Sequence, residues 1–249
     1  MFMLEEIKMS KKNNECLNTR YSSDQDVGQI ISSLSHELRT PLSIISSNLQ
    51  LLKSNSLDLD SELRSETFLL CEEALASVTH FLDDIHLLNI ANKGELKKKP
   101  TLININKLIE QIVNQPNTSY YKSNRIKVNA NITKTLFYSD ERLLNRIISG
   151  LLDNAFKFSA KEVTLTVMND DRWLNIEIED KGFGIPEEKI ELIFKPFYRC
   201  ENVKMINGSG LGLSIVQKAV ECLNGKISIE SIVSKNTKVK LKIPSDDEC

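Results

Sequence analysis

The stretch SLSHELRTPLSII, residues 33–45, decides the N-terminal fold because it carries a seven-residue apolar repeat. Seven positions around it follow alternating steps of four and three residues: Ile31, Ser35, Leu38, Leu42, Ile45, Leu49 and Leu52. Six of these seven are apolar, a pattern that indicates a helix with a coiled-coil or bundle seam.

A second helix is predicted from about residue 61 to residue 91. The same three-four spacing recurs at Phe68, Cys71, Leu75, Val78, Leu82 and Ile85. Residues 53–60, KSNSLDLD, are rich in turn and N-cap residues and should reverse the chain. Since one hairpin cannot bury two wide apolar faces, we expect two copies to form a homodimer through a four-helix bundle.

Beyond residue 100 the pattern alternates between helix and strand. Helical signals fall at 106–113, 140–158, 186–194 and 211–223, and strand signals at 126–132, 163–167, 174–178, 226–232 and 238–243. Interleaved helices and hairpin-like strands favour a two-layer α/β sandwich. The expected fold class is therefore α+β. An irregular segment (1–25) precedes a helical hairpin (26–92), a linker (93–101) and an α/β domain (102–249).

Composition narrows the function classes. The 249 residues are 41% hydrophobic and 27% charged with a net charge of −2, which is typical of a soluble globular protein without a nucleic-acid footprint. Apolar runs of only a few residues predict no direct membrane span, and the N-terminus lacks a secretory signal. The five cysteines have no paired spacing, which favours free thiols and a cytoplasmic location.

His36 is the candidate nucleophile. It follows the seam position Ser35, which places its ring beside the seam and facing outward. Glu37 can serve as a general base toward the imidazole. Thr40 lies one turn further, where its hydroxyl could position water. A histidine on a helix is usually structural, and we interpret His80 and His86 in that way.

Two downstream strings suggest a nucleotide site. In LLDNAFKFS, residues 151–159, Asn154 offers a neutral oxygen suited to Mg²⁺ and Lys157 a charge for phosphates. In EDKGFGIP, residues 179–186, Asp180 can recognise a base amino group, while Gly182 and Gly184 allow close backbone approach. Taken singly, each string fits an ordinary helix or turn about as well.

Two more strings follow. In IFKPFYR, residues 193–199, Arg199 is the side chain that could touch a terminal phosphate, although the aromatics fit a core equally well. In GSGLGLSIV, residues 208–216, Gly208, Gly210 and Gly212 precede an apolar helix whose first N–H groups could cradle phosphates. The string lacks the Lys-Ser/Thr ending of a P-loop.

Together and in this order, the strings resemble sensor histidine kinases of two-component systems over residues 27–245. HELRTPL resembles the H box, and the later strings resemble the N, first glycine, F and second glycine boxes. The ATP-binding domain is similar to those of gyrase, Hsp90 chaperones and MutL repair proteins.

The resemblance implies ATP and Mg²⁺ as cofactors. Asp180 would read adenine, Asn154 would hold Mg²⁺, and the backbone at Gly210, Leu211 and Gly212 would bind phosphates. Residues 200–207 would form a mobile lid.

The γ-phosphoryl group would pass to His36, assisted by Glu37, and then to an aspartate of a response regulator's receiver domain. Glu37 and Thr40 also match the family's pattern for phosphatase activity, in which water attacks the phosphorylated receiver domain.

The sequence departs from the family at several points. Gly150 stands where a second asparagine is common, which predicts a weaker metal site, and Ser234 and Asn236 replace usual glycines. No sensor segment precedes His36, so we expect either an upstream sensor protein or a chain that is a fragment.

Three alternatives stay open. One is a weak or degenerate kinase that acts as a dimeric scaffold or phosphatase. The others are an ATP-driven conformational machine and a serine kinase of the anti-sigma type, both of which lack a phosphoacceptor helix.

Overall fold

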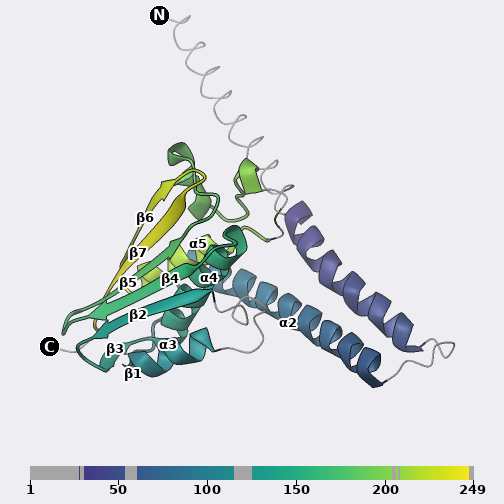
Figure 1. Cartoon of the computed structure of the whole chain (residues 1–249), viewed down its shortest axis with the longest axis horizontal. Helices are drawn as coiled ribbons and strands as arrows, with labels where there is room; N and C mark the ends of the chain where they lie inside the picture. Colours follow the sequence, from purple (N-terminus) through teal and green to yellow (C-terminus); the bar gives the residue numbers. More distant parts are fainter. Residues whose placement is uncertain are drawn as a thin grey trace, which may run out of the picture. The chain divides into compact units, whose positions relative to one another are not determined.

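The computed structural model describes residue 28 and residues 31–53, 61–114, 125–203, 206 and 208–246. One compact unit ends at Val78 and the second begins at Thr79. Figure 1 labels the helices and strands along the chain. The predicted turn at 54–60 and the irregular segment 1–25 lie outside the described residues. The domain boundaries expected from the sequence stay predictions.

Two long helices make up the N-terminal part, as the heptad pattern predicts. The first spans residues 31–53, and α2 spans Ser61–Asn92. In the described part of the chain, no helix combines the length and apolar character needed to cross a membrane. The predicted helical hairpin is confirmed.

The C-terminal part alternates strands and helices. In chain order, it contains β1 (Thr101–Asn104), α3 (Ile105–Val113), β2 (Ile126–Ile132), β3 (Leu136–Ser139), α4 (Glu141–Phe158), β4 (Val163–Asn169), β5 (Trp173–Asp180), the 3-10 turns η2 (Glu187–Lys189), η3 (Leu192–Phe194) and η4 (Glu201–Val203), α5 (Gly212–Cys222), β6 (Lys226–Ile232) and β7 (Asn236–Pro244).

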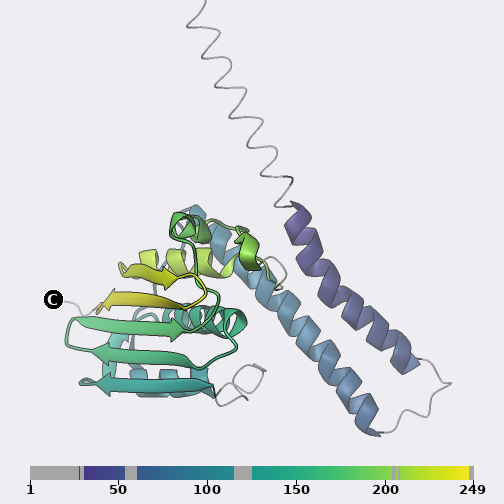
Figure 2. The same cartoon turned by 45° about the horizontal axis from the view of Figure 1, so that its top comes forward.

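Five strands form one sheet in the order β2-β4-β5-β7-β6, and β1 pairs with β3 separately. Strands β4, β5 and β7 alternate between buried and partly exposed residues, so each presents one apolar face. That face packs with α3, α4 and α5 in one hydrophobic core, and Figures 1 and 2 show α4 and α5 on the same side of the sheet. The predicted two-layer α/β sandwich is confirmed.

The structure differs from the sequence prediction in three places. Residues 186–194 were expected to be helical but contain only the 3-10 turns η2 and η3. Pro196 accounts for part of this difference, because the residue before a proline is driven out of the α region, and Lys195 is extended with ψ at 133°. Strands β1 and β3 were not predicted, and β2 runs parallel to β4 rather than forming a hairpin.

Asp140 fixes the start of α4, the helix that carries Asn154. Its carboxylate accepts hydrogen bonds from the backbone N–H groups of Arg142 (3.0 Å), Leu143 (3.2 Å) and Lys99 (2.7 Å). Burial opposes ionisation, but hydrogen bonds from the Arg142 side chain and these backbone groups lower the pKa of Asp140. One buried carboxylate therefore ties the preceding segment to the first turn of α4.

Candidate nucleotide site and phosphoacceptor helix

The C-terminal half of α4 faces the glycine-rich segment that leads into α5. A Cβ atom built on Gly212 would lie 3.7 Å from Asn154 Nδ2 and 3.9 Å from Oδ1. A Cβ on Gly208 would collide with the Lys157 ammonium group. The structure thus brings together two polar side chains and the glycines that the sequence analysis assigned to one site.

The Asn154 amide has an unsatisfied donor. Its Nδ2 atom is buried and has no hydrogen-bond partner, which is costly for a polar group in a protein interior. The first turn of α5 lies beside it, and the first N–H groups of a helix have no partners within the helix. Such a concentration of donors fits an anionic ligand such as a polyphosphate.

The loop after β5 is held between two other elements. The Phe183 N–H donates to the Phe158 carbonyl at the end of α4 (3.2 Å), and the Phe183 carbonyl accepts from the Ser234 N–H (2.7 Å). Gly184 has a φ of +66°, and a Cβ there would collide with the Ile232 carbonyl, so only glycine fits. The loop is therefore clamped between α4 and the β6–β7 turn.

Asp180 ends β5 at the start of this loop. The side chain is buried, and its Oδ1 accepts a hydrogen bond from the Gly182 N–H at 2.8 Å. Burial raises the pKa of Asp180 to about 6, although the Gly182 hydrogen bond opposes the rise. A desolvated carboxyl group in a loop clamped to α4 is the kind of group that binding sites use for recognition.

Arg199 folds back on its own segment. Its Nη2 atom donates to the carbonyls of Val203 (3.3 Å) and Ile206, so the guanidinium group links two residues within the predicted lid. Lid residues 204, 205 and 207 lie outside the described part. The role of Arg199 at a terminal phosphate stays a prediction.

The helix over residues 31–53 presents His36 to solvent, while Glu37 is half-buried. The Thr40 hydroxyl donates to the His36 carbonyl at 3.4 Å. His80 and His86 are also exposed, on α2. The three residues predicted for the phosphoacceptor helix, His36, Glu37 and Thr40, therefore lie within about one helical turn.

Sequence reasoning missed Ser231, which supports the loop after β5. Its Oγ accepts the Ile185 N–H (2.8 Å) and donates to the Asn236 carbonyl (2.9 Å). Ser234, in the turn between β6 and β7, has a φ of +60°, which explains why glycine suits that position. Ser231 lies on the same partly buried face of β6 as Ile227 and Ile229, and a single serine in such a strand does not by itself predict a role in holding a distant loop.

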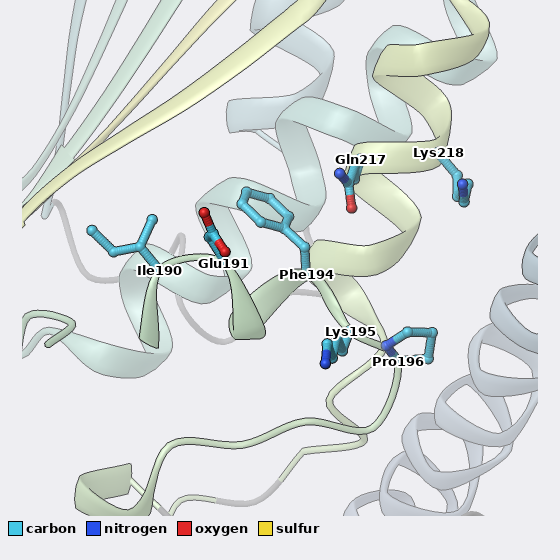
Figure 3. Close-up of a pocket in the computed structure, with 7 residues that line it drawn as sticks. All are labelled: Ile190, Glu191, Phe194, Lys195, Pro196, Gln217 and Lys218. Atoms are coloured by element: carbon cyan, nitrogen blue, oxygen red, sulfur yellow. The ribbon is translucent and has the colours of Figure 1, made fainter. Parts of the chain in front are cut away.

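A separate surface hollow of about 420 Å³ lies between the η3 region and α5 (Figure 3). It is lined by Ile190, Glu191, Phe194, Lys195, Pro196, Gln217 and Lys218. None of the predicted nucleotide residues belongs to it, so this hollow and the candidate site are different places.

Comparison with known proteins defines the class. Residues 26–91 match the His Kinase A (phospho-acceptor) domain, and residues 139–247 match the histidine kinase-, DNA gyrase B- and HSP90-like ATPase family. The chain belongs to the histidine protein kinases, enzymes of two-component signalling with an ATP-binding domain.

A curated relative supports the same class. Histidine protein kinase SaeS of Staphylococcus aureus (strain USA300) is 31% identical over 238 residues, which cover 92% of this chain and 67% of the relative.

Two solved structures share the fold. Histidine kinase AdeS of Acinetobacter baumannii has a TM-score of 0.61 at 23% identity, with coverage of 85% of this chain and 98% of that one. Full-length ShkA in complex with AMPPNP has a TM-score of 0.61 at 22% identity. The match covers 88% of this chain and 46% of that one.

Proposed function

We propose that this kinase transfers the γ-phosphoryl group of ATP to His36 and then to an aspartate of a response regulator. The observation that carries the proposal is the unpartnered amide of Asn154 beside the start of α5, in a chain whose matched phosphoacceptor segment exposes His36.

ATP would bind between α4 and the two glycine segments. The Asp180 carboxylate would accept a hydrogen bond from the adenine amino group. Asn154 Nδ2, the Lys157 ammonium and the N–H groups of Gly210, Leu211 and Gly212 would bind the phosphates. Gly182 and Gly184 would let the loop backbone lie against the Phe158 and Ile232 carbonyls, where a Cβ atom would collide, and so hold Asp180 beside the base.

Mg²⁺ fits the site as an ion shared with the nucleotide. Within the described ranges, no group of three His, Cys, Asp or Glu side chains could hold a metal. The Asn154 amide oxygen would be its protein ligand, and Mg²⁺ characteristically takes one or two protein groups plus substrate phosphates and waters. When bound, the ion would neutralise charge on the transferring phosphoryl group.

The reaction breaks the bond between the γ-phosphorus and its bridging oxygen and forms a bond from phosphorus to an imidazole nitrogen of His36. ADP leaves, and Glu37 takes the imidazole proton. Phosphoryl transfer depends mainly on positioning and charge neutralisation, which the buried amide and the Lys157 charge would provide.

Dimerisation follows from the exposed apolar residues of the hairpin. Ile31, Leu42 and Leu49 are 57%, 53% and 44% exposed, and Phe68 and Leu75 on α2 are 53% and 59% exposed. Exposed apolar side chains at this spacing on both helices mark an interaction site, and a second copy would cover them in a four-helix bundle.

We propose that a response regulator's receiver domain docks on this bundle and that an upstream sensor protein supplies the signal. The ATP requirement and the unpaired cysteine spacing support a cytoplasmic location.

The kinase reaction can be tested with γ-labelled ATP and Mg²⁺. Wild-type chain should acquire acid-labile, alkali-stable label, His36→Gln should acquire none, and His86→Gln, which changes an exposed histidine on α2, should label normally. Nucleotide binding without label on His36 would instead support the degenerate scaffold.

Phosphatase activity belongs to the same proposal. The Thr40 hydroxyl lies one turn from His36 and could orient a water molecule toward a phosphorylated receiver domain. Thr40→Ala should slow receiver dephosphorylation while autophosphorylation persists. Unchanged dephosphorylation would remove Thr40 from this role.

A further inference from the structure

The core-facing side of strands β5, β7 and β6 changes from apolar to polar at one end of the sheet. The three strands are neighbours (Figure 1), so residues in register form rows across them. One row, which belongs to the hydrophobic core or packs against it, consists of Ile178, Val239 and Ile229. Two residues further along each strand, on the same face, the next row consists of Asp180, Thr237 and Ser231. Three polar side chains on this face need hydrogen bonds that replace those lost to water.

Ser231 uses its full hydrogen-bonding capacity in this row and in the loop after β5. A serine hydroxyl has one proton to donate and two lone pairs that accept. The proton is donated to the Asn236 carbonyl (2.9 Å), and one lone pair accepts the Ile185 N–H (2.8 Å). In the 3.0 Å contact with Thr237 Oγ1, Thr237 is therefore the donor, and its proton takes the second lone pair. One hydroxyl thus holds the loop and also sets the rotation of the Thr237 hydroxyl.

The effect of this arrangement falls on Asp180, the cross-strand partner of Thr237. Side chains directly opposite each other on adjacent strands have Cβ atoms about 5 Å apart, so these two buried side chains are neighbours. Because the Thr237 proton is directed at Ser231, the Thr237 oxygen keeps its lone pairs and offers an acceptor beside the Asp180 carboxyl group. Two neighbouring acceptors suit a ligand group with two N–H donors, such as the amino group of adenine.

We propose that Ser231 is a positioning residue for recognition of the adenine amino group. The inference deepens the proposed nucleotide site and rests on it, because it requires Asp180 to bind the base. Ser231 acts through Ile185, which belongs to the loop that follows Asp180, and through Thr237, whose hydroxyl it orients. Without the Ser231 hydroxyl, the Thr237 proton is free to turn toward the Asp180 carboxylate. It would then occupy the acceptor that the adenine amino group needs.

Discrimination between two nucleotides tests this role. Calorimetry measures the affinity of the whole chain for AMPPNP and for its inosine counterpart, in which a carbonyl oxygen replaces the amino group. The ratio of the two affinities measures recognition of the amino group. Ser231→Ala should lower the preference for AMPPNP about fivefold or more, the scale of the net contribution of one hydrogen bond. Ser228→Ala, which changes an exposed serine on the opposite face of β6, should keep the wild-type preference.

A merely structural role gives a different pattern. Ser231→Ala that weakens binding of both nucleotides by the same factor overturns the inference, and so does unchanged binding of both. An equal loss of preference in Ser228→Ala would also overturn it. If Ser231→Ala does not fold, Ser231→Cys provides the test, because a thiol is only a weak donor and acceptor. A folded Ser231→Cys with the wild-type preference contradicts the role.

Asp180→Asn separates this inference from the proposal on which it rests. If wild-type chain binds both nucleotides equally, no amino group is recognised, and base recognition by Asp180 fails together with the role of Ser231. If wild type prefers AMPPNP, Asp180→Asn abolishes the preference and Ser231→Ala retains it, the base site stands and only the role of Ser231 fails.

Discussion

Replacing Asp180 with asparagine should stabilise the nucleotide-free protein and weaken ATP binding at the same time. The change keeps the shape of the side chain and removes its charge. The asparagine Oδ1 would still accept the Gly182 N–H, which now lies 2.8 Å from Asp180 Oδ1. Its NH₂ group would then face the adenine amino group, donor against donor, so the acceptor that recognises adenine is lost.

The stability gain follows from the buried charge. A pKa raised from 3.8 to about 6 means that ionisation of Asp180 costs about 3 kcal/mol in the folded state at pH 7.5. Stability contributed by the neutral carboxyl group is fully present below pH 3.8 and is lost as the pH rises through about 6. The advantage of Asp180→Asn should therefore shrink to about half of that value at pH 5.

Urea unfolding at pH 7.5 and pH 5, with AMPPNP calorimetry at pH 7.5, measures both effects. Glu179→Gln is the matched control, because Glu179 is the adjacent carboxylate of β5. Burial opposes its ionisation, but the Asn236 amide and the Lys238 ammonium lower the pKa of Glu179. Glu179→Gln should gain no stability and bind AMPPNP normally. The reasoning is refuted if Asp180→Asn has the same pH dependence as wild type or retains full affinity.

Three further changes and one matched control probe the site and its support. Gly184→Ala should lower the free energy of unfolding by more than the roughly 1–3 kcal/mol of positive-φ strain, because its Cβ also strikes the Ile232 carbonyl. Gly94→Ala is the control, because Gly94 has a φ of +71° but open space around it, so this change should cost only the strain. If urea unfolding shows equal losses of unfolding free energy for the two variants, the clash at Gly184 is contradicted. Lys157→Gln should weaken ATP binding about tenfold and leave AMP affinity unchanged, as calorimetry can check; an equal loss for AMP would remove Lys157 from the outer phosphates. Asp140→Ala should lower the unfolding free energy by about 2 kcal/mol through loss of the α4 cap, and an unchanged urea midpoint would argue against the cap.

Elements with strong periodicity could be predicted from the sequence. Asp140 signals the start of α4 because an acidic N-cap precedes a long apolar repeat, and the glycines before Leu211 signal the start of α5. Both signals are local. The approach of Asn154 and Lys157 to the glycines before α5 could also be inferred, because the order of these strings along the chain matches one family; the place of Asp180 in the same site stays a prediction.

The missed features depend on contacts between distant segments. Strands β1 and β3 are four residues each, too short for an alternating pattern, and Ile103 is buried in a core to which its strand partner Phe137 and distant helices contribute. The parallel pairing of β2 with β4 depends on α4 crossing between them. Ser231 gains its role from a hydrogen bond to a loop residue 46 positions away, which no spacing in the sequence reveals.

The most direct measurement is mass spectrometry at neutral pH of chain incubated with ATP and Mg²⁺, with ADP quantified in parallel. The proposed mechanism predicts one phosphoryl group on residue 36 for each ADP formed during the first turnover, and neither product with His36→Gln. Steady ADP release without a phosphorylated histidine would contradict the mechanism and favour an ATP-driven conformational machine.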